Sequence, residues 1–341
     1  MFEHPRDCRL IMLTGPSEAG EPVKISVIVP MFDAAEVIAT QLVALRDQVT
    51  DVTFEVIVVD DLSTDGGAAV VASFAALHPG IRLVPGDGYG SYAARNTGVR
   101  ASGSELLLFC DADDRADPTW VNAMAGALEL HSIVAGPTPL DALNDPVVRQ
   151  WRSDEHLAAP RRFGHIIVGT TANLGIRRSV FEHVGGFRED VRNGDDVGIC
   201  CRAHRLGIPV VHEIRAVVQY RTRSTLNGHL RQGVQYGRSW HRLCVEYGKG
   251  EGPGPTPVRL VGSLVLNIAQ SVAARIRADR AMLGVHTGNA GFAWGALTAW
   301  MAGNPAPRRA RWKTLLHAPV QAIIELRHWR RRSRQQGGSD T

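Results

Sequence analysis

Cysteine is scarce in this sequence, and it is not arranged for metal binding or cross-linking. The 341 residues include five cysteines, with no Cys-x-x-Cys spacing and an odd total. This pattern argues against a zinc site and against a disulfide framework, and it fits a reducing cytoplasm. The cysteines are Cys8, Cys110, Cys200, Cys201 and Cys244.

Long apolar runs are also missing. Residues 1–23 carry acidic side chains and prolines without a long apolar core, so we expect a loose leader and no secretory signal. Elsewhere no uninterrupted apolar stretch reaches the roughly 18 residues of a spanning helix. Hydrophobic residues at 44% and charged residues at 21% are ordinary for a folded soluble protein.

Positive charge is concentrated at one end of the chain. From Arg308 onward there are nine Arg or Lys and two acidic residues, although the whole chain has a formal net charge of only +4. The rest of the chain is therefore mildly acidic. Such a basic tail is typical of a protein that meets an anionic surface, either phospholipid or nucleic acid.

Strands and helices alternate between residues 24 and 110. Apolar runs predict strands at 24–30, 54–59, 81–84 and 105–110, and helical spacing occurs at 34–47, 68–77 and 91–101. This alternation predicts an α/β fold with a mostly parallel sheet. The strands are almost continuously apolar, as expected where helices cover both faces of a sheet.

The pattern is less regular after Trp120. Residues 137–165 read as a long surface excursion, and helices are expected at 179–184, 196–206 and 230–247, with a strand inside 210–220. A Gly- and Pro-rich stretch marks a linker. We therefore divide the chain into a leader (1–23), a catalytic domain (24–247), a linker (248–257) and a helical, basic extension (258–341).

Two predicted strands end in carboxylates. Asp60 and Asp61 follow one strand, and Asp111 and Asp113 follow another, with Asp114 beside them. Ligands of open parallel sheets bind beyond the carboxyl ends of the strands, so both groups should face one crevice. Mg²⁺ and Mn²⁺ commonly bind one or two carboxylates together with substrate phosphates. The alternative for such acids is a solvated strand end that caps the next helix.

Several motifs together resemble the family 2 glycosyltransferases, which have the GT-A fold. The resemblance extends over roughly residues 24–245, and its motifs stand in the order expected of that family. They are residues 25–30, 58–66 (VVDDLSTDG), 93–98 (AARNTG), 111–114 (DADD), 173–178 (NLGIRR), 184–187 (VGGF) and 194–196 (GDD).

The resemblance implies a nucleotide-diphosphate sugar donor (UDP, GDP or dTDP), a hydroxyl acceptor and a divalent cation, Mg²⁺ or Mn²⁺. At Asp60, Asp61 and Asp65 the alternative to nucleotide binding is hydrogen bonding within a turn or a helix cap. At Arg95 the alternative to diphosphate binding is an ion pair with a nearby aspartate. The implied donor-binding residues are Pro30, Asp60, Asp61, Asp65, Arg95 and Asp111, and the implied metal ligands are Asp113 and Asp111.

On the acceptor side, the resemblance implies that Asp196 is the general base of an inverting displacement. General-base catalysis of this kind contributes about 10²–10⁴-fold. Asn173, Arg177 and Asp195 are expected to shape the acceptor side. Helix capping is the alternative for Asp195 and Asp196, and one acid can cap while the other catalyses.

The chain departs from the family pattern at two places. Gly198 stands where relatives often carry a second acid after the base. Tyr220 and Arg221 stand where many relatives carry a histidine that completes the metal site. Arg221 and Arg223 are candidates to neutralise phosphate in its place.

Apolar helices, tryptophans and clustered arginines predict peripheral membrane contact through residues 258–341, on the inner face of a cytoplasmic membrane. The alternative is a helical hairpin packed on the catalytic domain. A lipid-linked or cell-envelope acceptor would fit membrane contact.

Other functions remain open at this point. A metal-dependent nucleotidyltransferase usually has a Gly-rich, basic loop after its first strand, whereas this chain has Pro30, Met31, Phe32 and Asp33 there. A non-catalytic sugar-nucleotide-binding scaffold is another alternative. Binding of RNA through the tail is disfavoured because no RNA-type aromatic motif is evident.

Overall fold

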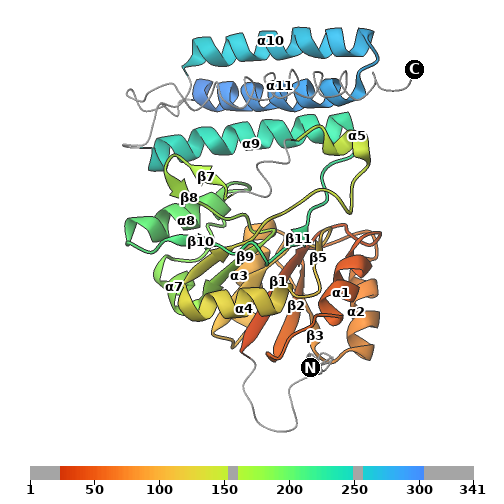
Figure 1. Ribbon diagram of the computed structural model, residues 1–341, viewed down its shortest axis with the longest axis vertical. Coiled ribbons are helices and arrows are strands. Elements are labelled where there is room, and N and C mark those ends of the chain that lie inside the picture. The colour runs from red at the N-terminus through yellow and green to blue at the C-terminus, as the bar shows by residue number, and fades with distance from the viewer. Residues whose placement is uncertain (1–23, 153–159, 249–255, 303–341) are drawn as a thin grey trace, which may run out of the picture. The chain divides into compact units, whose positions relative to one another are not determined.

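A computed structural model describes residues 24–152, 160–248 and 256–302 (Figure 1). The predicted leader, part of the surface excursion, most of the linker and the basic tail beyond residue 302 lie outside the described residues. The chain forms two compact units, one ending at Thr225 and the other beginning at Leu226.

The first unit is built on a seven-stranded sheet with the order β10-β6-β9-β4-β1-β2-β3. The central strand β1 pairs in parallel with β2 and β4, while β9 runs antiparallel to both β4 and β6. This arrangement confirms the predicted α/β class with a mostly parallel sheet. The strands are β1 Ile25–Met31, β2 Phe54–Asp60, β3 Ile81–Pro85, β4 Leu106–Phe109, β6 Ile133–Ala135, β9 Leu174–Arg177 and β10 Val210–His212.

Helices cover both faces of the sheet. Successive side chains of a strand point to opposite faces, so each strand packs against helices on both sides. Val56 and Val58 of β2 belong to the large core that also contains residues of α1, α2 and α4. Ile57 and Val59 pack instead with Ala94 of α3. The helices are α1 Ile38–Arg46, α2 Gly67–Leu77, α3 Ser91–Ala101, α4 Trp120–Leu130, α5 Pro146–Arg149, α7 Arg178–His183 and α8 Asp195–Arg205.

A glycine lets α3 lie close to the sheet. A Cβ atom at Gly98 would come within 2.5 Å of the Ile28 side chain, so only glycine permits this approach. Because α3 is held directly on the strands, its N-terminal turn lies at a defined position relative to their ends.

The region after residue 120 is more regular than its sequence indicates. It contains α4, with Trp120 and Met124 fully buried, and the short strand β6. Two small antiparallel sheets also form, one of β5 (Arg115–Ala116) with β11 (Val218–Gln219) and one of β7 (Arg162–Phe163) with β8 (Ile166–Ile167). The β5–β11 pair brings the segment after residue 219 beside the acidic turn that precedes β5.

In its described residues, the second unit contains three long helices, α9 Leu226–Tyr247, α10 Pro257–Ile276 and α11 Arg280–Met301. Within this unit α11 lies between α9 and α10 (Figure 1). Helix α9, which sequence analysis assigned to the end of a domain spanning 24–247, is therefore grouped with the C-terminal helices. Its glycines pack against α11, which accounts for this grouping.

Helix α10 is long and apolar enough to cross a membrane by length and composition alone. The sequence contains no uninterrupted apolar run of that length because serine, asparagine, glutamine and glycine are scattered through this helix. Only 17% of its most apolar window is buried, so α10 is not the core helix of the unit.

Candidate active site

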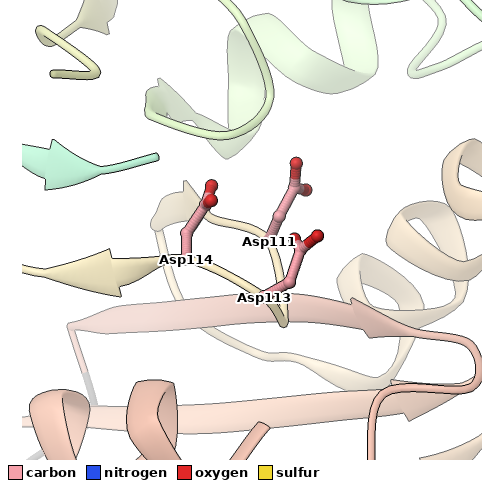
Figure 2. Close-up of side chains that lie close together, drawn as sticks. All are labelled: Asp111, Asp113 and Asp114. Carbon is pink, nitrogen blue, oxygen red and sulfur yellow. The ribbon is translucent and has the colours of Figure 1, made fainter. Parts of the chain in front are cut away.

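Three carboxylates meet at the turn that follows β4. One oxygen atom from each of Asp111, Asp113 and Asp114 lies within 4.8 Å of the others, and Figure 2 shows the side chains projecting from a single turn. The buried Gln41 of α1 holds this turn, because its Nε2 donates to the Asp111 carbonyl at 3.2 Å and its Oε1 accepts from the Ala116 amide at 2.9 Å. The strand end and the helix together fix the cluster.

Burial and neighbouring carboxylates destabilise the charged forms of Asp113 and Asp114. Asp114 is fully buried, and burial raises its pKa well above the usual range, with further contributions from Asp111 and Asp113. Burial and the neighbouring Asp111 also raise the pKa of Asp113. Asp114 Oδ1 accepts a hydrogen bond from the Arg221 amide at 2.8 Å, whereas its buried Oδ2 has no hydrogen-bond partner among the described residues.

These features fit a hard divalent cation. The cluster offers only oxygen donors, its mutual repulsion would be relieved by positive charge, and one buried oxygen is left without a partner. Asp111 and Asp113 are the predicted ligands, and the structure places Asp114 beside them.

Helix α3 joins this cluster to α8. Arg95 is almost completely buried and forms an ion pair with Asp111. Tyr92 lies one turn earlier, and its hydroxyl accepts from the amides of Asp195 at 2.9 Å and Asp196 at 3.2 Å. The same hydroxyl donates to Asp196 Oδ1 at 3.2 Å. One turn of helix therefore contacts both acidic groups.

Sequence reasoning did not select Tyr92, although its position one turn before Arg95 puts both side chains on the same face of a helix. Burial, together with the negative charge of Asp196, raises the pKa of Tyr92 well above its ordinary value. The phenol consequently stays protonated and keeps its role as a donor to Asp196. Arg95 forms an ion pair with Asp111, which was the alternative to diphosphate binding, and its contact with diphosphate stays a prediction.

The two acids at the start of α8 have different surroundings. Asp195 is fully buried, and its two oxygens contact Arg202 Nη1 at 3.0 Å and Nη2 at 3.1 Å and accept from the Arg188 amide at 2.8 Å. Asp196 is partly exposed. Asp195 is therefore held by structural contacts, whereas Asp196 is partly exposed and lies beside Tyr92.

This arrangement also explains Gly198. A Cβ atom there would lie 2.3 Å from Asp195 Oδ1, so a second acid at that position would displace the Asp195–Arg202 pair. The glycine is thus coupled to the structural role of Asp195. The predicted contribution of Asp195 to the acceptor side is not supported by its contacts.

The carboxylates after β2 organise loops. Asp61 accepts from the amides of Gly88 and Gly90, both at 2.8 Å, and Asp65 accepts from Ala35 at 2.7 Å and Gly67 at 2.9 Å. These backbone hydrogen bonds lower the pKa of Asp65. Both residues thus have the turn chemistry that competed with nucleotide binding, and their direct contact with a nucleotide stays a prediction.

Asp60 and Pro30 lie at the same edge of the sheet as the acidic cluster. In the strand register Pro30 pairs with Val59 and Met31 with Asp60, while Ile28 pairs with Phe109 on the other side of β1. The ends of β2 and β4 therefore flank the end of β1. Asp60 Oδ1 accepts from the Ser63 amide at 3.2 Å.

Comparison with known proteins agrees with this fold. Residues 26–185 match the sequence profile of Glycosyl transferase family 2. The chain contains a family 2 glycosyltransferase domain. A mannosyltransferase from Pyrobaculum calidifontis, solved with GDP-Man and Mn²⁺, has the same fold. It matches with a TM-score of 0.52 and 21% identity, over 93% of this chain and 86% of that one.

Two curated relatives illustrate the sequence similarity. The chain is 29% identical over 188 residues to Glycosyltransferase AglE of Haloferax volcanii, covering 54% of this chain and 62% of the relative. It is 27% identical over 253 residues to the Pre-mycofactocin glycosyltransferase of Mycobacterium tuberculosis, covering 69% of this chain and 49% of the relative. The chain thus spans less than two thirds of either relative.

In this glycosyltransferase domain, arginines stand where the resemblance expects a metal-site histidine. Arg221 Nε donates to the Asp113 carbonyl at 2.9 Å, and Arg223 Nη1 lies 3.6 Å from Asp113 Oδ2. The β5–β11 pairing positions both arginines. Positive charge therefore borders the acidic cluster from the side where a neutral ligand was expected.

Two predicted acceptor-side residues have structural surroundings in the glycosyltransferase domain. Asn173 is fully buried; its Nδ2 donates to the carbonyls of Pro137 and Ala216, and its Oδ1 accepts from Trp120 Nε1. Arg177 pairs with Leu106 at the beginning of β4, the opposite end from the acidic turn. The antiparallel direction of β9, which the sequence pattern did not reveal, produces this placement, so Arg177 is not part of the proposed site.

Proposed function

We propose that the protein is an inverting, metal-dependent glycosyltransferase that moves a sugar from a nucleotide-diphosphate donor to a hydroxyl acceptor. The observation that carries this proposal is the link through α3: Arg95 contacts the acidic cluster and Tyr92 contacts Asp196. A transferase of this kind needs a group that binds the leaving diphosphate and a base for the acceptor. One turn of α3 contacts the residues that we propose for these two roles.

On the donor side, Asp111 and Asp113 would hold Mg²⁺ or Mn²⁺ against the diphosphate, with Asp60 and Pro30 at the neighbouring strand ends toward the nucleoside. When bound, the cation neutralises charge that builds on the departing nucleoside diphosphate. Arg223 lies at the exposed side of Asp113 and can turn toward a phosphate oxygen, because its side chain is mostly exposed.

On the acceptor side, Asp196 takes the proton of the attacking hydroxyl. The hydrogen bond from Tyr92 fixes one carboxylate oxygen of Asp196 and leaves the other to receive the proton. Attack from the face opposite to the leaving group replaces one bond at the anomeric carbon in a single step. The configuration at that carbon is therefore inverted.

The similar proteins support a nucleotide-sugar donor but do not identify the sugar. The Pyrobaculum calidifontis mannosyltransferase binds GDP-Man with Mn²⁺, and we include UDP-, GDP- and dTDP-sugars in the proposal. A lipid-linked or cell-envelope acceptor and a location on the cytoplasmic face of a membrane belong to the same proposal. They are supported by the apolar helix α10 and the basic tail.

A donor panel tests the proposal. Each nucleotide sugar is incubated with the full chain and Mg²⁺ or Mn²⁺, with and without EDTA and with and without added pyrophosphate, and donor binding, free nucleoside diphosphate and nucleoside triphosphate are measured. A transferase or its background hydrolysis releases nucleoside diphosphate, whereas a nucleotidyltransferase run in reverse converts the nucleotide sugar and added pyrophosphate into nucleoside triphosphate and sugar 1-phosphate. Absence of metal-dependent donor binding across the panel would refute the proposal, and formation of nucleoside triphosphate would favour the nucleotidyltransferase.

A further inference from the structure

Helix α10 buries the polar side chain of Asn267 and leaves a row of apolar side chains exposed. Its buried residues are Leu260, Asn267 and Ala274, and the Asn267 amide oxygen lies 3.3 Å from His286 Nδ1 of α11. Asn267 also donates to Ser263, and Ser271 donates to the Asn267 carbonyl. The exposed side consists of Val258, Val261, Val265, Leu266, Ile268, Val272 and Ile276.

The exposed residues form one continuous stripe. Positions 258, 261, 265, 268, 272 and 276 recur every three or four residues, which places them on the same face of a helix. A helix of 20 residues is about 30 Å long, so the stripe is extended. In water a helix of this kind normally turns its apolar face inward. Helix α10 has a second apolar face that stays exposed, which indicates that something other than water covers this outer face.

The remaining two helices pack in a way that leaves this stripe outside. Gly233 and Gly237 of α9 face α11 so closely that a Cβ atom would meet the carbonyl oxygens of Gly288 at 2.4 Å and Phe292 at 2.0 Å. Spacing of small residues at i and i+4 is a packing mode common in membrane helices. Helices α9 and α11 therefore hold together through backbone contact, without the outer side of α10.

Charge favours lipid over a second copy of the chain as the covering partner. Between Thr256 and Ala278 there is no acidic residue, while Arg259 stands near one end of α10 and Arg275 and Arg277 near the other. Two copies paired along the stripe, in either direction, would bring arginine against arginine. Anionic headgroups at both ends of an apolar helix would complement the same charges.

We infer that the outer stripe of α10 inserts into the interfacial layer of a lipid bilayer, with the helix axis parallel to the surface. An in-plane position submerges only the apolar side of α10. A spanning position would also carry α11, which includes His286 and Asn289 and joins α10 by a short turn, into hydrocarbon at a large cost. This inference deepens the membrane location included in the proposed function, and it does not rest on the proposed sugar transfer.

Vesicle flotation of the full chain tests the inference. Vesicles of phosphatidylcholine alone measure the apolar contribution, and vesicles with added phosphatidylglycerol measure the combined effect of charge and stripe. The test variant is Val265→Glu combined with Ile268→Glu, which changes two exposed side chains in the middle of the stripe. The matched control is Leu77→Glu combined with Leu130→Glu, at exposed positions on α2 and α4, and the basic tail is intact in all three proteins.

The wild type and the control are expected to float with phosphatidylcholine, and the stripe variant to partition at least about tenfold less. Equal flotation of the stripe variant would overturn the inference. So would a wild type that does not float but elutes as a dimer which the stripe variant converts to a monomer, because a second copy would then cover the face. Transfer to a soluble acceptor should be unchanged in the stripe variant, which separates this result from a failure of the proposed activity.

Discussion

Tyr92 and Arg95 stand one turn apart on α3, and the Arg95 guanidinium carbon lies 5.6 Å from the centre of the Tyr92 ring. Each side chain binds a different acid, since Tyr92 contacts Asp196 and Arg95 contacts Asp111. The distance between the two acids is therefore set by a rigid helix rather than by a loop. A reaction that needs a base on one side of the anomeric carbon and a diphosphate on the other depends on such a fixed spacing.

Replacing Tyr92 by phenylalanine should uncouple Asp196 from α3. The change removes a hydroxyl that satisfies two backbone amides and one carboxylate oxygen, so we expect a loss of about 1–3 kcal/mol in the free energy of unfolding. We also expect kcat to fall about 10- to 100-fold because the base loses its orientation. Donor KM should change little, since Arg95 still contacts Asp111.

Steady-state kinetics and chemical denaturation measure these effects. Phe187 stacks on the Tyr92 ring, with centroids 5.4 Å apart, and that contact survives in the phenylalanine variant. A variant with unchanged kcat would show that Tyr92 has no positioning role. An increase in donor KM alone would instead assign Tyr92 to donor binding.

Asp196→Asn tests the base directly. Asparagine keeps the size of the side chain and can still accept the Tyr92 hydrogen bond, but it cannot take a proton at neutral pH. We expect kcat to fall about 10²–10⁴-fold while donor affinity, measured by calorimetry with Mn²⁺, stays within a factor of about two. Asp141→Asn, at an exposed residue paired with Arg149, is the control and should retain full activity. Undiminished turnover in Asp196→Asn would remove this residue from the mechanism.

The site residues that follow strand ends could be predicted from the sequence. Asp60 and Asp113 each follow a nearly continuous apolar run, and parallel strands bring such ends to one edge of a sheet. The expected role of Arg177 came from the family resemblance, and the hydrophobic pattern did not show that β9 enters the sheet antiparallel, which places Arg177 beside the beginning of β4.

The second limit on prediction from the sequence was that it does not show which groups each side chain contacts. Asp61 and Asp195 carry the same carboxylate as Asp60 and Asp196, yet backbone amides and Arg202 engage them. Only the tertiary structure shows which acid of each pair is engaged, since the partners are up to 29 residues away in the chain for Asp61. The relation of Gly198 to Asp195 was hidden for the same reason, because it depends on the space beside a buried ion pair.

Arg223→Ala should alter metal binding before any donor is present. Arg223 contacts Asp113 at 3.6 Å from a mostly exposed position, so it competes with a cation for that carboxylate. Exposed ion pairs contribute about 0.2–1 kcal/mol, which predicts Mn²⁺ affinity about two- to fivefold higher in the variant. Donor affinity should fall at the same time if the guanidinium turns to the diphosphate.

Electron paramagnetic resonance of free Mn²⁺ measures the first effect, and calorimetry with the preferred donor measures the second. Arg215→Ala provides a control, since this exposed arginine pairs with Glu213 away from the acidic turn. Mn²⁺ binding that is unchanged or weaker in Arg223→Ala would mean that the arginine does not compete for Asp113.

His241 should make the second unit sensitive to acid. Its side chain is fully buried, neither ring nitrogen has a hydrogen-bond partner among the described residues, and burial lowers its pKa. The folded chain therefore binds this proton less readily than the unfolded chain does. Stability is retained above the ordinary histidine pKa of about 6.5 and is lost as pH falls from there toward the lowered value. His241→Leu, which places an uncharged apolar group in the same space, should remove this part of the pH dependence.

Hydrogen exchange of the α9 amides at pH 7 and pH 5 measures the effect locally, after correction for the intrinsic pH dependence of exchange. At pH 5 the α9 amides should be less protected in the wild type than in His241→Leu. At pH 7 the protection should be equal in the two proteins or slightly higher in His241→Leu. His286 is partly buried and its pKa is also lowered by burial, but it contacts Asn267, and Asp279 opposes the lowering of its pKa. The variant His286→Gln therefore serves as a comparison. Equal loss of protection in His241→Leu and the wild type would show that the charging of another group, rather than of His241, loosens the helices.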